Sequence, residues 1–286
     1  MTRLLVVGGS GFTGRAVASA LARRPHVQVR WTTHRTPSPC RATDEIVHAD
    51  LSDPATVRGL AGDCDAVIHL GHQITGTPTE LAAVNDTGAG ALADEATRAG
   101  ARLVALSTAA VHGAGPWQGE DIHTLPEAPT SVLSRTRLAG DHRVLAAGGT
   151  VIRPHLVIGP GDRWVIPRAA DLVAAFGWAV CGTARHSVIT VADLADHLLD
   201  TATESPTGGG EHQGGVRLAA GADPTTLRSA IAAHLRATGR RPAPSAQRNV
   251  GHTRIAADPR RAHDIDLLSA DHYLTCTCTS TARSTR

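Results

Sequence analysis

The chain has 286 residues, a formal net charge of +2 and only 2% aromatic residues. That length suits a large nucleotide-binding domain with a smaller lobe, and the small net charge argues against a nucleic-acid or membrane-surface partner. No apolar run reaches the ~18 residues of a membrane span, and the five cysteines lack a second pair of ligands at metal-binding spacing. We therefore expect a cytoplasmic monomer or homodimer that binds a small molecule and no metal.

The first apolar segment, Leu4–Val7, runs into three glycines spaced three residues apart, and a helical pattern follows over residues 15–24. A parallel strand buried on both faces is continuously apolar, and only glycine lets the following backbone approach a pyrophosphate closely. The free N–H groups of the helix would point at the phosphates. The alternative is a glycine-rich turn in an ordinary α/β protein. The pattern predicts a dinucleotide site formed by Gly8, Gly11, Phe12, Thr13 and Gly14.

The second predicted strand, near Val27–Trp31, ends without an acidic residue. Enzymes that use NAD usually carry Asp or Glu there to bind the 2′-hydroxyl of the adenosine ribose. The guanidinium of Arg35 suits a 2′-phosphate instead, so we predict NADPH and disfavour NADH. The alternatives are that Arg35 is a solvated loop residue, or that Arg30 or Arg15 takes this role.

The glycine spacing around Phe12, together with the later stretches Asp65–Gly71 and Arg102–Gly113, resembles extended short-chain dehydrogenases/reductases, a family related to sugar-nucleotide epimerases and dehydratases. The resemblance implies a Rossmann-type, doubly wound parallel α/β sheet with a small C-terminal substrate lobe. It divides the chain into a dinucleotide-binding domain over 1–158, on which 188–205 also packs, and a substrate-binding lobe over 159–187 and 206–274. Residues 275–286 have no apolar pattern, which predicts a disordered tail.

The resemblance also assigns cofactor contacts beyond the glycine turn. The pair after the third strand matches residues that lie beside the adenine, and the end of the fourth strand matches a segment that packs against the cofactor. His72 follows that strand, and its alternative role is that of an ordinary loop histidine. The further cofactor positions implied are Asp50, Leu51, Leu70, Gly71, His72, Ser107, Arg137 and Pro154.

Two catalytic positions of the family differ in this chain. Leu138–Asp141 resembles the residues that follow the family's Tyr-x-x-x-Lys motif, which places Leu133 at the tyrosine and Arg137 at the lysine. Residues four apart share a helix face, so family members present the proton donor and its lysine together. Here a hydrocarbon replaces the donor and a permanently charged guanidinium replaces the amine. All 28 basic residues are arginine, and Tyr273 is the one tyrosine, so no neighbouring residue restores the motif.

Thr108 aligns with the family's catalytic Ser/Thr, and His112 stands where a non-catalytic tyrosine is usual. A general acid contributes about 10²- to 10⁴-fold, whereas positioning two reactants can remove roughly 7–11 kcal/mol of a barrier, so losing the tyrosine weakens a reductase without abolishing it. We favour a ketoreductase in which Thr108 orients the carbonyl, Arg137 positions the reactants, and the proton comes from His112, water or the substrate.

Tyrosine-less reductases that this chain resembles tailor aromatic polyketides such as angucyclinones. This implies a role in antibiotic biosynthesis and a polycyclic aromatic ketone as the substrate. A phenol beside the ketone could neutralise the alkoxide as hydride arrives. The alternatives are an NADP-binding regulator without catalysis and an enzyme similar to nucleotide-sugar epimerases or dehydratases.

The scarce aromatic residues predict where the substrate binds. Trp117 lies in a proline-rich loop over residues 114–130, and Trp164 follows the loop that opens the family's substrate lobe. The alternative for such residues is ordinary core packing. The expected substrate contacts are Trp117, Leu133, His155 and Trp164.

Overall fold

The computed structural model describes residues 2–204, 214–243, 265 and 267–276. The chain forms two compact units. The first unit comprises Met1–Gly113, Pro126–Arg153 and Val191–Ala219, and the second comprises Ala114–Leu125, Pro154–Thr190 and Ala220–Arg286. Within the described ranges, none of the helices combines the length and apolar character that a membrane crossing requires.

The first unit contains a seven-stranded sheet. Six neighbouring strands, from β7 to β3, run parallel, and the chain order reverses between β4 and β1, which is the switch point of a Rossmann-like α/β fold. The predicted fold class is therefore confirmed. In spatial order the strands are β10 (Gly215–Ala219), β7 (Thr150–Pro154), β5 (Arg102–Leu106), β4 (Ala66–His69), β1 (Arg3–Val7), β2 (Gln28–Thr33) and β3 (Glu45–His48).

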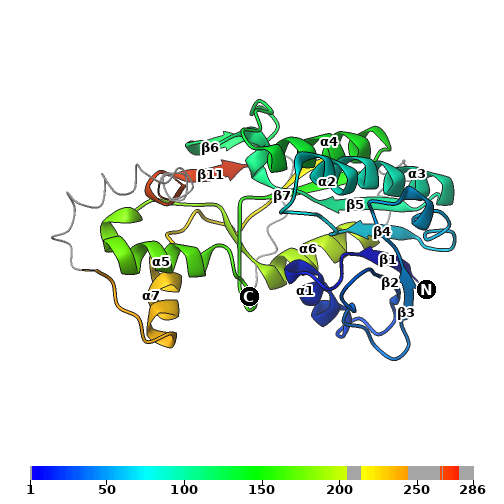
Figure 1. Ribbon diagram of the computed structural model, residues 1–286, viewed down its shortest axis with the longest axis horizontal. Coiled ribbons are helices and arrows are strands. Elements are labelled where there is room, and N and C mark those ends of the chain that lie inside the picture. The colour runs from blue at the N-terminus through cyan, green and yellow to red at the C-terminus, as the bar shows by residue number, and fades with distance from the viewer. Residues whose placement is uncertain (1, 205–213, 244–264, 266, 277–286) are drawn as a thin grey trace. The chain divides into compact units, whose positions relative to one another are not determined.

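Helices cover both faces of this sheet (Figure 1). On one face, α1 (Phe12–Leu21) packs against α6 (Val191–Thr203). The other face carries α2 (Pro78–Ala82), a π-helical segment η2 (Ala83–Gly88), α3 (Ala89–Ala99) and α4 (Val132–Ala146). Two short 3₁₀ segments, η1 (Pro54–Thr56) and η3 (Ala109–His112), complete the unit.

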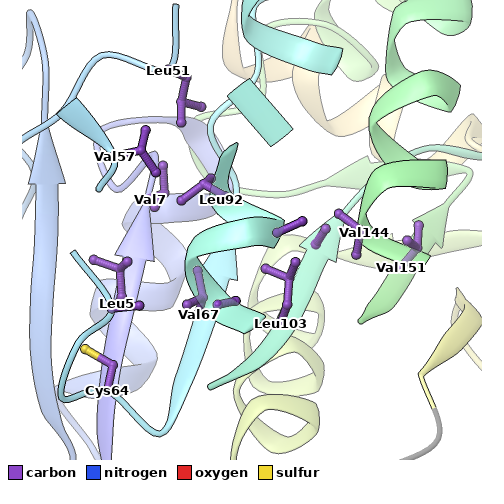
Figure 2. Close-up of a cluster of buried hydrophobic side chains, with 14 residues drawn as sticks. Leu5, Val7, Leu51, Val57, Cys64, Val67, Leu92, Leu103, Val144 and Val151 are labelled. Carbon is purple, nitrogen blue, oxygen red and sulfur yellow. The ribbon is translucent and has the colours of Figure 1, made fainter. Parts of the chain in front are cut away.

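The core of the first unit explains why its central strands are continuously apolar. Leu5, Val67 and Leu103 project from adjacent strands, and Leu92 on α3 and Val144 on α4 pack against them (Figure 2). Each of these side chains is buried. Strands covered on both faces cannot alternate polar and apolar residues, so the apolar runs reflect this two-sided burial.

The second unit has its own apolar core, in which α5 packs against α7. Two parallel strand pairs, β6–β11 and β8–β9, are linked by a bridge between His186 and His272. Its elements are β6 (Trp117–Asp121), β8 (Leu156–Ile158), α5 (Ile166–Phe176), η4 (Trp178–Val180), β9 (Val188–Thr190), α7 (Arg228–Ala237) and β11 (His272–Thr275).

The boundaries of the units differ from the predicted domains in several stretches, among them residues 188–190, which were predicted to pack on the dinucleotide-binding domain but belong to the second unit. Residues 114–125 and 154–158, predicted for the dinucleotide-binding domain, belong to the second unit, where β6 pairs with β11 and β8 with β9. Residues 215–219, predicted for the substrate lobe, form β10 at the edge of the main sheet. A Cβ on Gly214 would lie 2.1 Å from the carbonyl oxygen of Gly148, so glycine is what admits the strand there.

The predicted tail also begins differently. Thr275 ends β11 and pairs with Asp121, so it is part of a strand rather than of a tail. Cys276 follows the strand, with its Sγ 3.3 Å from Nε2 of His123, and residues 277–286 lie outside the described residues.

Candidate active site

Two of the three glycines in the turn after β1 are required for steric reasons. Gly8 has φ +91°, and a Cβ there would lie 2.5 Å from the backbone nitrogen of Gly71. A Cβ on Gly14 would lie 2.4 Å from the carbonyl oxygen of Gly8, so this glycine lets α1 start directly against the turn. Gly11 is exposed, and its nearest contact would be 3.4 Å away. The turn therefore excludes a side chain at Gly8 and at Gly14 but has room for one at Gly11.

A cleft of about 770 Å³ in the first unit opens at the carboxyl ends of β1, β2 and β4. Helix α1 begins at this cleft after Gly11, and no side chain caps its first N–H groups. Phe12, Thr13 and Gly14 form its first turn. Uncapped N–H groups beside a glycine turn fit a dinucleotide pyrophosphate. The predicted cofactor residues that line the cleft are Gly8, Gly11, Arg35, Asp50, Leu51, Leu70, Gly71 and His72.

The end of β2 presents a cation to this cleft. Arg35 is exposed. Hydrogen bonds from Ser52 lower the pKa of Asp50 against the opposing effect of burial, and the charges of His34 and Arg35 add smaller contributions. His34 lies beside it, with Nε2 3.2 Å from Oδ2 of Asp50. Of the alternatives for this role, Arg30 is held by two carboxylates and Arg15 donates from Nε to the carbonyl of Ser10. Of these three arginines, Arg35 is the one that lines the cleft.

Arg137 lies on α4 and is held against the end of β5. Its Nη2 donates to the carbonyl oxygen of Leu106 at 2.8 Å. Burial lowers the pKa of Arg137 to about 10, and the charge of Asp141 opposes that change. The guanidinium therefore stays charged at neutral pH. Arg137 itself does not line the cleft, but it binds the same carbonyl as His72, which does.

A buried polar network lies beneath the predicted catalytic segment. Arg153 is 1% exposed, and its guanidinium donates to Asp141, to Glu127 and to His112 at distances of 2.9–3.1 Å. Ser107 donates from its hydroxyl to Asp141 at 2.8 Å. Burial raises the pKa of Asp141, and the charges of Arg153 and Arg137 limit the rise. The side chain of Ser107, predicted to contact the cofactor, is thus engaged inside the network.

His112, one of the predicted sources of the proton, takes part in this network through both ring nitrogens. Its Nε2 lies 3.1 Å from Nη1 of Arg153, and its Nδ1 lies 3.2 Å from the carbonyl oxygen of Pro126. Because a guanidinium only donates, Nε2 must accept, and Nδ1 carries the hydrogen that Pro126 accepts. Both ring nitrogens are therefore occupied in a neutral imidazole that is 6% exposed.

Thr108 caps the 3₁₀ segment η3 that follows β5. Its side-chain oxygen accepts a hydrogen bond from the N–H of Ala110 at 3.2 Å. That bond uses an oxygen lone pair and leaves the hydroxyl hydrogen able to donate to a substrate carbonyl. Leu133 is half-buried in the first turn of α4, one helical turn before Arg137. Helix α4 thus places Leu133 and Arg137 one turn apart, with a hydrocarbon at the position where the predicted register has an acid.

Four predicted ligand contacts belong to the second unit: Pro154, Trp117, His155 and Trp164. Trp117 is 5% exposed and packs edge-on against His155 and His272, so it is a core residue rather than an exposed wall. Burial lowers the pKa of His155 to about 3. Trp164 is 55% exposed. A contact of these residues with substrate stays a prediction.

The sequence analysis missed Arg153, Asp141 and Asn85 as organising residues. Asn85, in the π-helical segment, accepts from the N–H of Gln73 and donates to its carbonyl, and so holds the chain just after the cleft histidine His72. The available signals were a single arginine inside an apolar strand and an asparagine inside a helical pattern. Such residues are rarely buried unless they are paired.

Comparison with known proteins agrees with this geometry. A family profile described as "NAD dependent epimerase/dehydratase family" matches residues 4–212. The chain belongs to this epimerase/dehydratase family. The match covers both the glycine turn and the Leu133/Arg137 helix, and the description of the family supports an NAD(P) cofactor.

The relatives of this chain are named for several activities. The 2-alkyl-3-oxoalkanoate reductase of Stenotrophomonas maltophilia is 30% identical over 187 residues, which cover 59% of this chain and 55% of the relative. The 4-hydroxy-2-methyl-3-oxo-4-farnesyl-3,4-dihydroquinoline-1-oxide ketoreductase of Stigmatella aurantiaca is 29% identical over 232 residues, which cover 72% of this chain and 66% of the relative. The matched region thus spans about half to two thirds of these relatives.

Among solved structures, the Bordetella bronchiseptica enzyme WbmH, in complex with NAD⁺, aligns with a TM-score of 0.69 at 20% identity. The alignment covers 85% of this chain and 84% of WbmH. At this identity the likeness establishes a common fold.

Proposed function

We propose that this protein is an NADPH-dependent ketoreductase that reduces a ketone on a polycyclic aromatic polyketide, as a tailoring step in antibiotic biosynthesis. The observation that carries the proposal is the helix α4, which keeps a buried cation, Arg137, against β5 but presents Leu133 where the family has its acid. Two relatives named as reductases of oxo compounds support the ketone as the reacting group.

The residues of the first unit would orient the reactants without donating a proton. The bound cofactor would supply hydride to the carbonyl carbon. The free hydroxyl hydrogen of Thr108 would bind the carbonyl oxygen, and the charge of Arg137, held by Leu106, would stabilise negative charge that develops nearby. With a pKa of about 10, Arg137 keeps its proton at neutral pH.

The remaining proton would come from the substrate. His112 has both ring nitrogens engaged, so it is not free to donate this proton. A phenol next to the ketone forms an internal hydrogen bond, which polarises the carbonyl and neutralises the alkoxide as hydride arrives. A ketone without that phenol would depend on water and react more slowly.

The preference for NADPH rests on Arg35, whose side chain lines the cleft at the end of β2. A charge-assisted hydrogen bond to a 2′-phosphate is worth about 1.5–3 kcal/mol, or roughly 10- to 100-fold in affinity. We expect Arg35→Ala to weaken NADPH binding by this factor and to leave NADH binding unchanged. Arg58→Ala, an exposed arginine outside the cleft, is the matched control. Equal wild-type affinities for the two cofactors would refute the preference.

The activity is tested by NADPH oxidation with polycyclic ketones that carry or lack the neighbouring phenol. We expect turnover of the phenol-bearing ketones, a large loss in Thr108→Ala, recovery in Thr108→Ser, and persistence of turnover in His112→Phe. Loss of turnover in a folded His112→Phe variant would indicate that the protein, and not the substrate, donates the proton. Tight NADPH binding without turnover of any ketone would instead indicate a regulator.

A second candidate function is that of an epimerase or dehydratase acting on a nucleotide sugar, which the description of the family favours. Such enzymes first oxidise the sugar and need a base to remove the hydroxyl proton. Incubating the protein with nucleotide sugars and oxidised cofactor distinguishes this function, because an epimerase would change the sugar whereas the proposed ketoreductase would not.

A further inference from the structure

The carbonyl oxygen of Leu106, the last residue of β5, is shared by two side chains. His72 reaches it with Nε2 at 2.7 Å, and Arg137 reaches it with Nη2 at 2.8 Å. A carbonyl oxygen can only accept, so Nε2 of His72 must carry a hydrogen. Burial lowers the pKa of His72 well below its usual range, with Arg137 and His69 adding to the effect. His72 is therefore neutral, and its Nδ1 presents a bare lone pair.

That lone pair has no partner within the described residues. Nδ1 of His72 is buried without a hydrogen bond, although His72 itself lines the cleft. His69, its neighbour at a ring-centroid distance of 4.6 Å, has no hydrogen bond on either ring nitrogen and offers it none. A buried acceptor left unpaired is costly, so a ligand that donates to Nδ1 would remove that cost. A phosphate oxygen is excluded as the ligand atom, since two acceptors repel one another.

The strand order shows which part of a dinucleotide meets His72. The glycine turn that would hold the pyrophosphate follows β1, and Arg35, which would hold the adenosine phosphate, follows β2. His72 follows β4, on the other side of β1, with β5 next in the sheet. A dinucleotide bound across the switch point places its second half on that side. The donor nearest the pyrophosphate in that half is a ribose hydroxyl.

We propose that Nδ1 of His72 accepts a hydrogen bond from a hydroxyl of the ribose that bears the nicotinamide. His72 is then a specificity-determining residue for that half of the cofactor, held in the required tautomer by the Leu106 carbonyl. The inference rests on the proposed dinucleotide chemistry of the cleft. It does not depend on the ketone, on the source of the proton, or on turnover.

A series of three ligands tests the proposal by calorimetry: 2′,5′-ADP, 2′-phospho-ADP-ribose and NADP⁺. The first lacks the second ribose, the second has it without nicotinamide, and the third has both. In His72→Phe we expect affinity for the last two to fall about 3- to 10-fold, the range for one hydrogen bond between neutral groups, and affinity for 2′,5′-ADP to stay unchanged. His72→Asn, which keeps an acceptor, should recover part of the loss. His26→Phe, which replaces an exposed histidine outside the cleft, should change none of the three affinities.

Other results would overturn the proposal. If His72→Phe loses affinity for NADP⁺ alone, the donor is the nicotinamide amide and not the ribose hydroxyl. If it loses affinity equally for all three ligands, or for none, His72 does not bind this ribose. Nitrogen-15 spectra of the wild-type imidazole give a readout that needs no variant. We expect a hydrogen on Nε2 alone and a shift of the Nδ1 resonance when 2′-phospho-ADP-ribose binds; a hydrogen on Nδ1 would refute it. These binding experiments contain no ketone. Their results can therefore be interpreted even if the protein has no reductase activity.

Discussion

Replacing Arg153 by methionine tests whether the buried network supports the first unit. Methionine keeps most of the apolar stem but removes the guanidinium. The side chains of Arg153 and Asp141 are 2% and 5% exposed, and the shortest nitrogen–oxygen distance between them is 2.9 Å. The substitution also removes the donor to Nε2 of His112 and the 2.9 Å contact with Glu127. Three acceptors thus each lose one hydrogen-bond partner in a single change.

The expected loss in the free energy of unfolding is about 3–5 kcal/mol at neutral pH, because removing one partner leaves a buried charge uncompensated. The loss should depend on pH. Burial already raises the pKa of Asp141, and Arg153 limits that rise, so the folded-state pKa of Asp141 rises further in the variant. Above the unfolded pKa of about 3.9, the folded variant then holds a proton that the unfolded chain has released. Its stability deficit should therefore shrink as pH falls from 8 toward 5.

Equilibrium denaturation in urea at several pH values measures both quantities. Arg143→Met is the matched control, because Arg143 pairs with Asp86 but its side chain is 60% exposed. Exposed pairs contribute about 0–1 kcal/mol, so this control should lose little. The double substitution Arg153→Met with Asp141→Asn should be more stable than Arg153→Met alone, since it removes the unpaired charge. A loss below about 1 kcal/mol in Arg153→Met, or a loss independent of pH, would refute the reasoning.

Two further predictions concern the glycine turn and pH. Gly14→Ala should destabilise the first unit, since its Cβ would meet the carbonyl of Gly8 at 2.4 Å, whereas Gly11→Ala should fold normally and lose NADPH affinity. Thermal denaturation measures the stability of each variant and calorimetry measures its affinity for NADPH. Equal behaviour of the two variants would contradict the steric argument. Burial lowers the pKa of His155 to about 3, with His272 and His186 contributing. As pH falls from 6.5 to 5 the unfolded chain gains a proton there and the folded chain does not, so stability should fall by about 2 kcal/mol from this residue, and His155→Phe should remove that part of the slope.

Local patterns in the sequence were enough to locate the glycine turn that borders the cleft. An apolar strand, glycines at Gly8, Gly11 and Gly14, and an uncapped helix are neighbours in the chain, so their arrangement needs no distant partner. The same holds for Leu133 and Arg137, whose spacing places them on one face of α4. Helix periodicity and the steric freedom of glycine act over a few residues, so their effects can be predicted from the sequence alone.

The roles of the polar residues were decided by contacts between distant parts of the chain. His112 could have been a proton donor by its type and position, but Arg153, which lies 41 residues later, occupies its Nε2. His72 acquires its tautomer from the carbonyl of Leu106, 34 residues away, which also binds Arg137 from a third element. Residue type and spacing specify what a side chain can donate or accept. Which lone pair or hydrogen stays free depends on the groups that folding brings against it, and no local pattern records those.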